Sequence, residues 1–236
     1  MSTVLLVRHG LTAMTGPVLA GHTPGLHLDE RGIKQAEAVA ARIAVLPLSA
    51  IVTSPLERCV DTADAIAAAQ QAAGRTVERD VDERIVECRY GDWTGQQIKD
   101  LAKEPMWKIV QGQPSAARFP GGESLPEVSA RAVEAIREWD AKLGPEAIWV
   151  ACSHGDVIKA ILADALGLHL DQFQRIVVDP CSVSLVRYTD ARPYVLRAND
   201  IGADLSAFIP PKRRGRKSRS TAADATVGGG SGAGSV

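Results

Sequence analysis

The sequence predicts an α/β fold with a mostly parallel central sheet. Short apolar runs alternate along the chain with longer stretches in which apolar residues recur every three or four positions. The short runs are typical of strands buried on both faces, and the longer stretches are typical of amphipathic helices. Because strands that alternate with helices pair in parallel, these observations favour an α/β domain over an all-α or all-β one.

The first strand and helix flank a long loop. Residues 2–8 are predicted to form a strand, and residues 9–28, rich in Gly, Pro, Thr and His, a loop of the kind that carries function. Asp29 is expected to cap a helix that runs to about residue 45. The apolar positions at helical spacing are Ile33, Ala36, Ala40 and Ile43.

A second strand and helix follow. Residues 49–53 form an apolar run, after which Ser54 is expected to cap a helix with Pro55 at its first position. The helix is expected to end near Gly74, and residues 76–79 to form a third strand. The apolar positions that should line one face of this helix are Leu56, Val60, Ala63 and Ala67.

The middle of the chain has the weakest periodicity. Residues 84–122 are expected to be irregular, with one short helix at about 96–103. A long amphipathic helix is predicted from Glu123 to about Leu143, ended by Gly144 and Pro145. Its apolar stripe consists of Leu125, Val128, Ala132, Ile136 and Trp139.

The remaining elements complete the sheet. Residues 147–153 form another apolar strand, which ends in Ser153, His154 and Gly155. A helix over 156–166 and two final strands, over 182–188 and 194–198, are expected to follow.

The charge pattern divides the chain into a domain of residues 1–209 and a tail of residues 210–236. The tail holds six cations and one anion, a net +5, so the formal −1 of the whole chain leaves −6 for the domain. The tail passes from a basic cluster into a Gly/Ser-rich end and is expected to be disordered. The acidic domain argues against a nucleic-acid-binding protein, apart from weak nonspecific contact by the tail.

Composition excludes several other classes. The four cysteines, Cys59, Cys88, Cys152 and Cys181, form no Cys-x-x-Cys pair, which argues against a zinc ribbon. The sequence has no pattern of a signal peptide and no apolar run of the roughly 18 residues that would span a membrane. We therefore expect free thiols and a cytoplasmic protein.

Polar groups follow two of the buried strands. Arg8, His9 and Gly10 come directly after the first apolar run, and His154 and Gly155 after a later one. Because ligands bind beyond the carboxyl ends of parallel strands, these groups are expected to share one pocket. Arg58, one turn into the second helix, would join them, and two arginines with two histidines suit a phosphate.

This constellation also suits phosphoryl transfer. A neutral imidazole is a nucleophile near neutral pH, and neighbouring cations favour its neutral form. A carboxylic acid would have to protonate the leaving oxygen. The arginines supply positive charge, so we expect no metal or other cofactor.

Five motifs, LLVRHGLT, TSPLERCVDTA, ECRYGDWTG, FPGGES and CSHGDVI, occur in this order over residues 3–200. In this they resemble the histidine phosphatase superfamily, the phosphoglycerate mutase-like family, which implies a three-layer α/β/α sandwich. The resemblance implies that His9 is the nucleophile that becomes phosphohistidine, that Arg8, Arg58 and His154 bind the phosphate, and that Glu87 donates a proton. The stretch LAGHTPGLHLDERG resembles an actinobacterial branch of probable phosphomutases.

The chain departs from the family pattern at two positions. Thr15 stands where many members carry asparagine, six residues after the nucleophile. Asp156 stands where many relatives have an uncharged residue, and it is a rival to Glu87 as the acid; a carboxylate there also suits a helix N-terminus. We expect substrate contacts from the long loop at Thr12, Thr15, Gly21 and His22.

Three functions stay open, all acting on a small phosphorylated metabolite. The favoured one is hydrolysis of phosphomonoesters, because Gly91 to Gly95 resembles the phosphatases and only Lys108 and Arg118 supply cations between residues 108 and 122. A phosphoglycerate mutase-type phosphomutase, which would need 2,3-bisphosphoglycerate, is the first alternative. A non-catalytic phosphate-binding module is the second. A homo-oligomer is compatible with the sequence.

Overall fold

A six-stranded sheet forms the centre of the computed structural model, which describes residues 2–202 and Gly228. The strand order is β3-β2-β4-β1-β5-β6. The first four strands pair in parallel, β5 pairs antiparallel with β1, and β6 pairs antiparallel with β5. Their bounds are Ser2–Arg8 (β1), Ala50–Thr53 (β2), Glu78–Val81 (β3), Ile148–Ser153 (β4), Val183–Tyr188 (β5) and Tyr194–Asp200 (β6). The mostly parallel α/β fold predicted from the sequence is confirmed.

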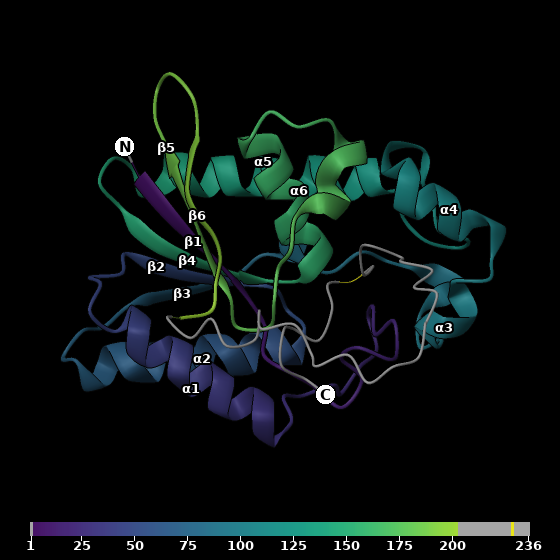
Figure 1. Ribbon diagram of the computed structural model, residues 1–236. Coiled ribbons are helices and arrows are strands. Elements are labelled where there is room, and N and C mark those ends of the chain that lie inside the picture. Colours follow the sequence, from purple (N-terminus) through teal and green to yellow (C-terminus); the bar gives the residue numbers. More distant parts are fainter. Residues whose placement is uncertain (1, 203–227, 229–236) are drawn as a thin grey trace, which may run out of the picture.

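Helices cover both faces of this sheet (Figure 1). Helices α1 (Glu30–Ile43) and α2 (Glu57–Ala72) lie on one face, and α5 (Leu125–Leu143) and α6 (Gly155–Ala165) on the other. Two short helices, α3 (Ile98–Leu101) and α4 (Pro105–Gly112), lie to one side. This is the three-layer sandwich that the resemblance implied.

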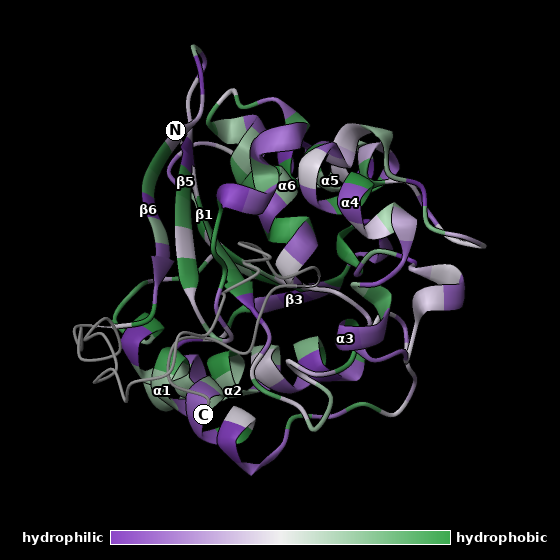
Figure 2. Ribbon diagram, turned by 45° about the vertical axis from the view of Figure 1, so that its right-hand side comes forward, coloured by the Kyte–Doolittle hydropathy of each residue, from purple (hydrophilic) through white to green (hydrophobic). Residues whose placement is uncertain are grey.

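The continuous apolar run of β1 follows from its place between two cores. Val4 and Leu6 pack into the core under α5 and α6, whereas Leu5 and Val7 pack into the core under α1 and α2. Side chains alternate between the faces of a strand, so a strand covered on both faces needs an apolar residue at every position. Figure 2, coloured by hydropathy, shows the hydrophobic colour along much of the visible part of β1. The apolar run covers Val4 to Val7, and the ends of the strand are polar.

The second helix differs from its prediction. It begins at Glu57 with Leu56 as its N-cap, so the predicted cap at Ser54 is wrong. The Ser54 N–H instead extends the sheet by donating to the Cys152 carbonyl, and its hydroxyl is used elsewhere, as described below. The predicted face is also wrong, because only Ala63 of it is fully buried; the buried residues are Arg58, Cys59, Thr62, Ala63, Ile66 and Gln70. Half of these side chains are polar, so hydropathy does not mark the face.

The boundaries of the other helices and strands differ less from their predictions. Asp29 caps α1 as expected, but Ile33 is 48% exposed, and Val39 takes its place in the core. Strand β3 begins and ends two residues later than the predicted range of 76–79, and it is an exposed edge strand. Helix α4 was not predicted, since residues 84–122 were expected to be irregular apart from one short helix at about 96–103. The long helix is confirmed, with Ser124 as N-cap in a capping box with Glu127.

All four cysteines are buried free thiols. Within the described residues, no helix combines the length and the apolar character needed to cross a bilayer. The predicted tail, residues 210–236, lies outside the described residues except for Gly228.

The loop that follows β1 packs backbone to backbone on α1. A Cβ atom at Gly32 would lie 2.0 Å from the Leu11 carbonyl oxygen, and one at Gly10 would lie 2.7 Å from the Gly32 carbonyl oxygen. Both glycines therefore serve close approach rather than an unusual backbone angle.

We expect Gly32→Ala to lower the free energy of unfolding by about 1–3 kcal/mol, because the new methyl group has to displace backbone. Gly112→Ala is the matched control, since a Cβ atom there meets no atom within 4 Å. Urea unfolding of both variants measures the difference, and equal stabilities would contradict the close packing.

Candidate active site

Two histidines meet at the carboxyl ends of β1 and β4. These strands are neighbours in parallel register, with Arg8 opposite Ser153. His9 and His154 each follow directly, and the His9 N–H donates to the Ser153 carbonyl at 3.0 Å. The centroids of the two imidazole rings lie 5.3 Å apart, so the structure brings together the histidine pair that the sequence placed at one sheet edge.

Arg58 connects both imidazoles. Its Nε donates to His9 Nε2 at 3.3 Å, and its Nη2 lies 3.3 Å from His154 Nδ1 and donates to the Gly21 carbonyl at 2.8 Å. Its Nη1 is buried without a hydrogen-bond partner among the described residues. A buried guanidinium N–H left without an acceptor is suited to an anion bound against it.

His9 is held as a neutral base with a defined tautomer. Its Nδ1–H donates to the Gly10 carbonyl at 2.7 Å, which leaves Nε2 as the lone-pair nitrogen that accepts from Arg58. Burial lowers the pKa of His9 well below 6.5, and the charges of Arg58 and Arg8 lower it further. The Gly10 N–H in turn donates to Thr62 Oγ1, which fixes the backbone beside the ring.

His154 is fully buried behind Arg58. Because its Nδ1 accepts from Arg58, its Nε2–H donates to Ser54 Oγ at 2.7 Å. Burial and the charge of Arg58 lower its pKa well below 6.5. This contact of Ser54 was not predicted from the sequence, although Ser54 follows β2 at the same edge of the sheet.

Glu87 lies at the same centre with 3% of its surface exposed. Burial and the nearby Asp156 carboxylate raise its pKa to about 8, against the opposing effects of Arg58, the Cys88 N–H and Arg8. The raised pKa favours the protonated form of this carboxyl group at neutral pH. His22 Nε2–H donates to the Glu87 carbonyl at 2.6 Å, and Arg131 Nη2 does so at 3.2 Å.

Asp156 has a different environment. It is fully buried in the first turn of α6, where it accepts from the Tyr90 hydroxyl at 2.8 Å and lies 3.5 Å from Lys159 Nζ. Both carboxylate oxygens are thus engaged, which favours Glu87 over Asp156 as a proton donor. Arg8 Nη1 donates to the Val178 carbonyl at 2.8 Å.

Part of this group lines a small cavity of about 30 Å³, which His154 and Asp156 do not reach. Thr12, Thr15 and Gly21 line it, and the hydroxyls of the two threonines lie 2.9 Å apart. His22 does not line it; its contact is with the Glu87 backbone. The other lining residues that belong to the predicted site are Arg8, His9, Arg58 and Glu87.

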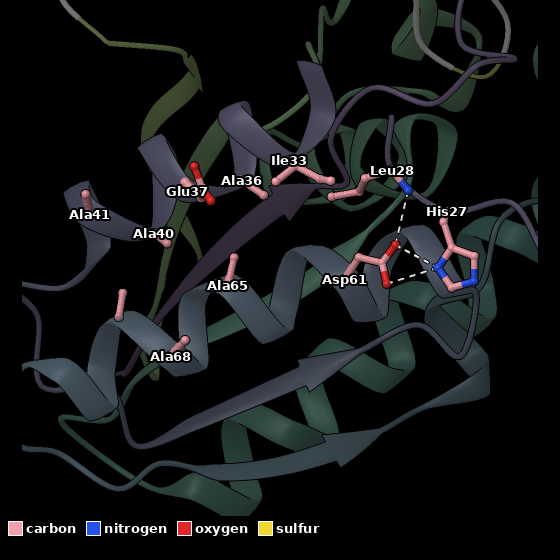
Figure 3. A pocket seen from close by; sticks show the side chains of 11 residues that line it. His27, Leu28, Ile33, Ala36, Glu37, Ala40, Ala41, Asp61, Ala65 and Ala68 are labelled. Carbon is pink, nitrogen blue, oxygen red and sulfur yellow. Dashed lines mark hydrogen bonds and ion pairs between the residues drawn. The ribbon is translucent and has the colours of Figure 1, made fainter. Parts of the chain in front are cut away.

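A larger hollow of about 580 Å³ lies between α1 and α2 (Figure 3). Alanines line most of it, and at one end His27 Nδ1 pairs with the Asp61 carboxylate at 3.0 Å. No lysine or arginine lines it among the described residues, so its size does not make it the phosphate site. Nor do the described residues contain a cluster of three or more side chains suited to a metal ion.

Comparison with known proteins agrees with this geometry. Residues 4–201 match the sequence pattern of the histidine phosphatase superfamily (branch 1). Phosphoserine phosphatase 1 of Hydrogenobacter thermophilus is 30% identical over 205 residues, which cover 84% of this chain and 92% of that protein. The probable phosphoglycerate mutase GpmB of Cronobacter sakazakii is 33% identical over 193 residues, which cover 80% and 86%.

Solved structures share the fold. YhfR of Bacillus stearothermophilus superimposes with a TM-score of 0.76 at 24% identity, covering 86% of this chain and 98% of that one. A mycobacterial glucosyl-3-phosphoglycerate phosphatase gives 0.73 at 25% identity, covering 84% and 98%. The narrower resemblance to an actinobacterial phosphomutase branch stays a prediction. With a sequence pattern matched over nearly the whole described domain, the chain belongs to branch 1 of the histidine phosphatase superfamily.

Proposed function

We propose that this protein hydrolyses small phosphomonoesters through a phosphohistidine formed on His9. One observation carries the proposal: the buried guanidinium group of Arg58 contacts the imidazoles of both His9 and His154. Its Nη1 has no hydrogen-bond partner among the described residues and can bind an anion. The protonated carboxyl group of Glu87 beside them supplies the acid that a phosphoryl transfer requires.

In the first step, His9 Nε2 attacks phosphorus and the bond to the ester oxygen breaks. Arg58 and Arg8 neutralise the charge on the phosphoryl oxygens, so electrostatic stabilisation does most of the work. The Glu87 proton passes to the leaving oxygen, which departs as a neutral alcohol. The hydrogen bond from His9 Nδ1–H to Gly10 keeps the ring oriented through this step.

In the second step, water attacks the phosphohistidine. Glu87, now a carboxylate, accepts the proton of that water, and the N–P bond breaks to return neutral His9 and inorganic phosphate. Glu87 thus ends the cycle protonated, as it began.

The pairing of nearby cations supports hydrolysis over a mutase reaction. A mutase needs a second anion clamp, but Arg118 pairs with Glu127 at 2.6 Å, and Arg131 is committed to three backbone carbonyls and to Glu123. Lys108 is exposed on α4. The names of the relatives above include both phosphatases and a mutase, so the mutase reaction remains the second candidate, with 2,3-bisphosphoglycerate as its cofactor.

The names of the relatives support a substrate class for this proposal. Phosphoserine and glucosyl-3-phosphoglycerate, named for two of the relatives, are small phosphorylated metabolites with polar leaving groups. We propose a cytoplasmic metabolite of this class, a location with which four free thiols agree.

A screen of phosphomonoesters, run beside a 3-phosphoglycerate mutase assay with its bisphosphate cofactor, tests the proposal. We expect release of inorganic phosphate, no mutase product, and a rate unchanged by EDTA, because the arginines supply the charge that a metal would otherwise supply. Mutase product without phosphate release would favour the second candidate, and inhibition by EDTA would reveal a metal requirement.

A further inference from the structure

A residue from the far end of the chain lies in the catalytic cavity. The carbonyl of Gly228 accepts from Arg8 Nη2 at 3.3 Å, although the two residues are 220 positions apart. Its N–H donates to Asp156 Oδ2 at 3.1 Å. One backbone unit therefore connects a cation predicted to bind phosphate with the buried carboxylate of α6.

The place that Gly228 occupies accepts only glycine without strain. Its φ angle is +77°, a conformation that residues with a side chain rarely adopt. A Cβ atom there would lie 3.2 Å from Leu19 Cδ1 and 3.6 Å from the Tyr90 hydroxyl. In the sequence, Gly228 begins a run of three glycines. We call the group formed by Arg8, Leu19, Tyr90 and Asp156 the glycine seat.

The glycine seat and the catalytic cavity overlap. Arg8, Leu19, Tyr90 and Gly228 line the same cavity as His9 and Glu87. With Gly228 in place, the cavity has about 30 Å³ of free volume, room for about two water molecules at roughly 10–15 Å³ each. A phosphomonoester needs more room than this, so it and Gly228 compete for the same space.

The hydrogen bonds of Gly228 also place it in competition with a bound phosphate. The Arg8 N–H that the Gly228 carbonyl accepts is one that a phosphoryl oxygen would require. A neutral carbonyl is a weaker acceptor for guanidinium than a phosphate dianion, and two hydrogen bonds hold the residue. A bound phosphate can therefore displace it.

We propose that Gly228 docks reversibly in the glycine seat and competes with the phosphorylated substrate for the catalytic cavity. The partner that this surface fits is a glycine backbone unit of the same chain, with one donor for Asp156 and one acceptor for Arg8. The inference rests on the proposed function for the identity of the competitor.

Gly228→Val in the full chain tests the competition. Valine is disfavoured at positive φ and its side chain would meet Leu19, so the seat should be empty in the variant. Gly202→Val is the matched control, because Gly202 also has a positive φ, +112°, but a Cβ atom there meets nothing within 4 Å. Both variants should retain the melting temperature of the unchanged protein.

The readouts are equilibrium binding of inorganic phosphate and the kinetics of p-nitrophenyl phosphate hydrolysis. We expect Gly228→Val to bind phosphate about tenfold more tightly and to lower KM in parallel with kcat unchanged, since removing a competing state raises apparent affinity. The control should match the unchanged protein. Phosphate affinity that is unchanged or weaker in Gly228→Val would overturn the inference, as would a lack of phosphate binding in all three proteins.

The two proposals fail in different ways. If both proteins hydrolyse phosphomonoesters but Gly228→Val binds phosphate no more tightly than the unchanged protein, the docking of Gly228 in the glycine seat is refuted and the proposed function is not. Tighter phosphate binding in the variant with no hydrolysis of any phosphomonoester would refute the proposed function alone.

Discussion

Replacing His9 by alanine is expected to lower turnover of phosphomonoesters by a factor of about 10⁴–10⁶, the loss typical of removing a covalent nucleophile. The alanine has no nitrogen to accept the phosphoryl group, and water cannot take its place with the geometry that Arg58 imposes on the ring. The steady-state rate with p-nitrophenyl phosphate measures the loss, with circular dichroism to show that the fold persists.

His27→Ala is the matched control, because it removes another imidazole, one that is exposed and paired with Asp61 away from the cavity. Its activity should match that of the unchanged protein. Substantial activity in His9→Ala would show that another group, or water directly, attacks phosphorus.

Replacing Glu87 by glutamine is expected to give a loss that depends on the leaving group. For alkyl phosphates, whose alcohols leave poorly, the loss should be about 10²–10⁴, the range for removal of a general acid. For p-nitrophenyl phosphate it should be much smaller, because nitrophenolate leaves without a proton. Comparing kcat/KM over esters of graded leaving-group pKa measures this dependence.

The pH profile gives an independent readout of the same group. Glu87 must be protonated to act, and its pKa is raised to about 8, so kcat/KM should fall as the pH rises through 8. Glu87→Gln should lack this alkaline fall. On the acid side His9 must be neutral, and since its pKa is lowered well below 6.5, activity should persist below pH 6.5.

Asp156→Asn is the control that separates the two carboxylates. The Asp156 charge raises the pKa of Glu87, so its removal should move the alkaline fall of kcat/KM to lower pH. Because Glu87 still donates its proton in this variant, alkyl phosphates should lose no more activity than p-nitrophenyl phosphate. A loss confined to poor leaving groups in Asp156→Asn, with Glu87→Gln unaffected, would assign the acid to Asp156.

The centre of the site was predictable because its residues stand at strand ends. The chain places Arg8, His9 and His154 directly after apolar runs, and a parallel sheet brings such ends to one edge. Local sequence was sufficient for this inference, since few residues separate each strand from its polar group.

Contacts that depend on tertiary packing were less predictable. Ser54 resembles a helix cap in sequence, and only the position of His154 from another strand reveals its use as an acceptor. The buried face of α2 holds Arg58, Thr62 and Gln70, and each of these side chains is hydrogen-bonded to a residue far away in the sequence, a feature that hydropathy does not reveal. Glu87 had no local signal, and family resemblance was needed to select it.

The contact of Gly228 with Arg8 could not be predicted from the sequence. A glycine-rich stretch has the composition of a flexible linker, and nothing local identifies a binding partner 220 residues away.

Trapping the phosphoryl group on the protein tests the central claim most directly. Protein mixed with a ³²P-labelled phosphomonoester and quenched in base within one turnover should carry label at His9, stable in alkali and lost in acid, as expected for an N–P bond. The label should be absent from His9→Ala. Unlabelled protein during active turnover, or label on another residue, would contradict the assignment of His9 as the group that receives the phosphate.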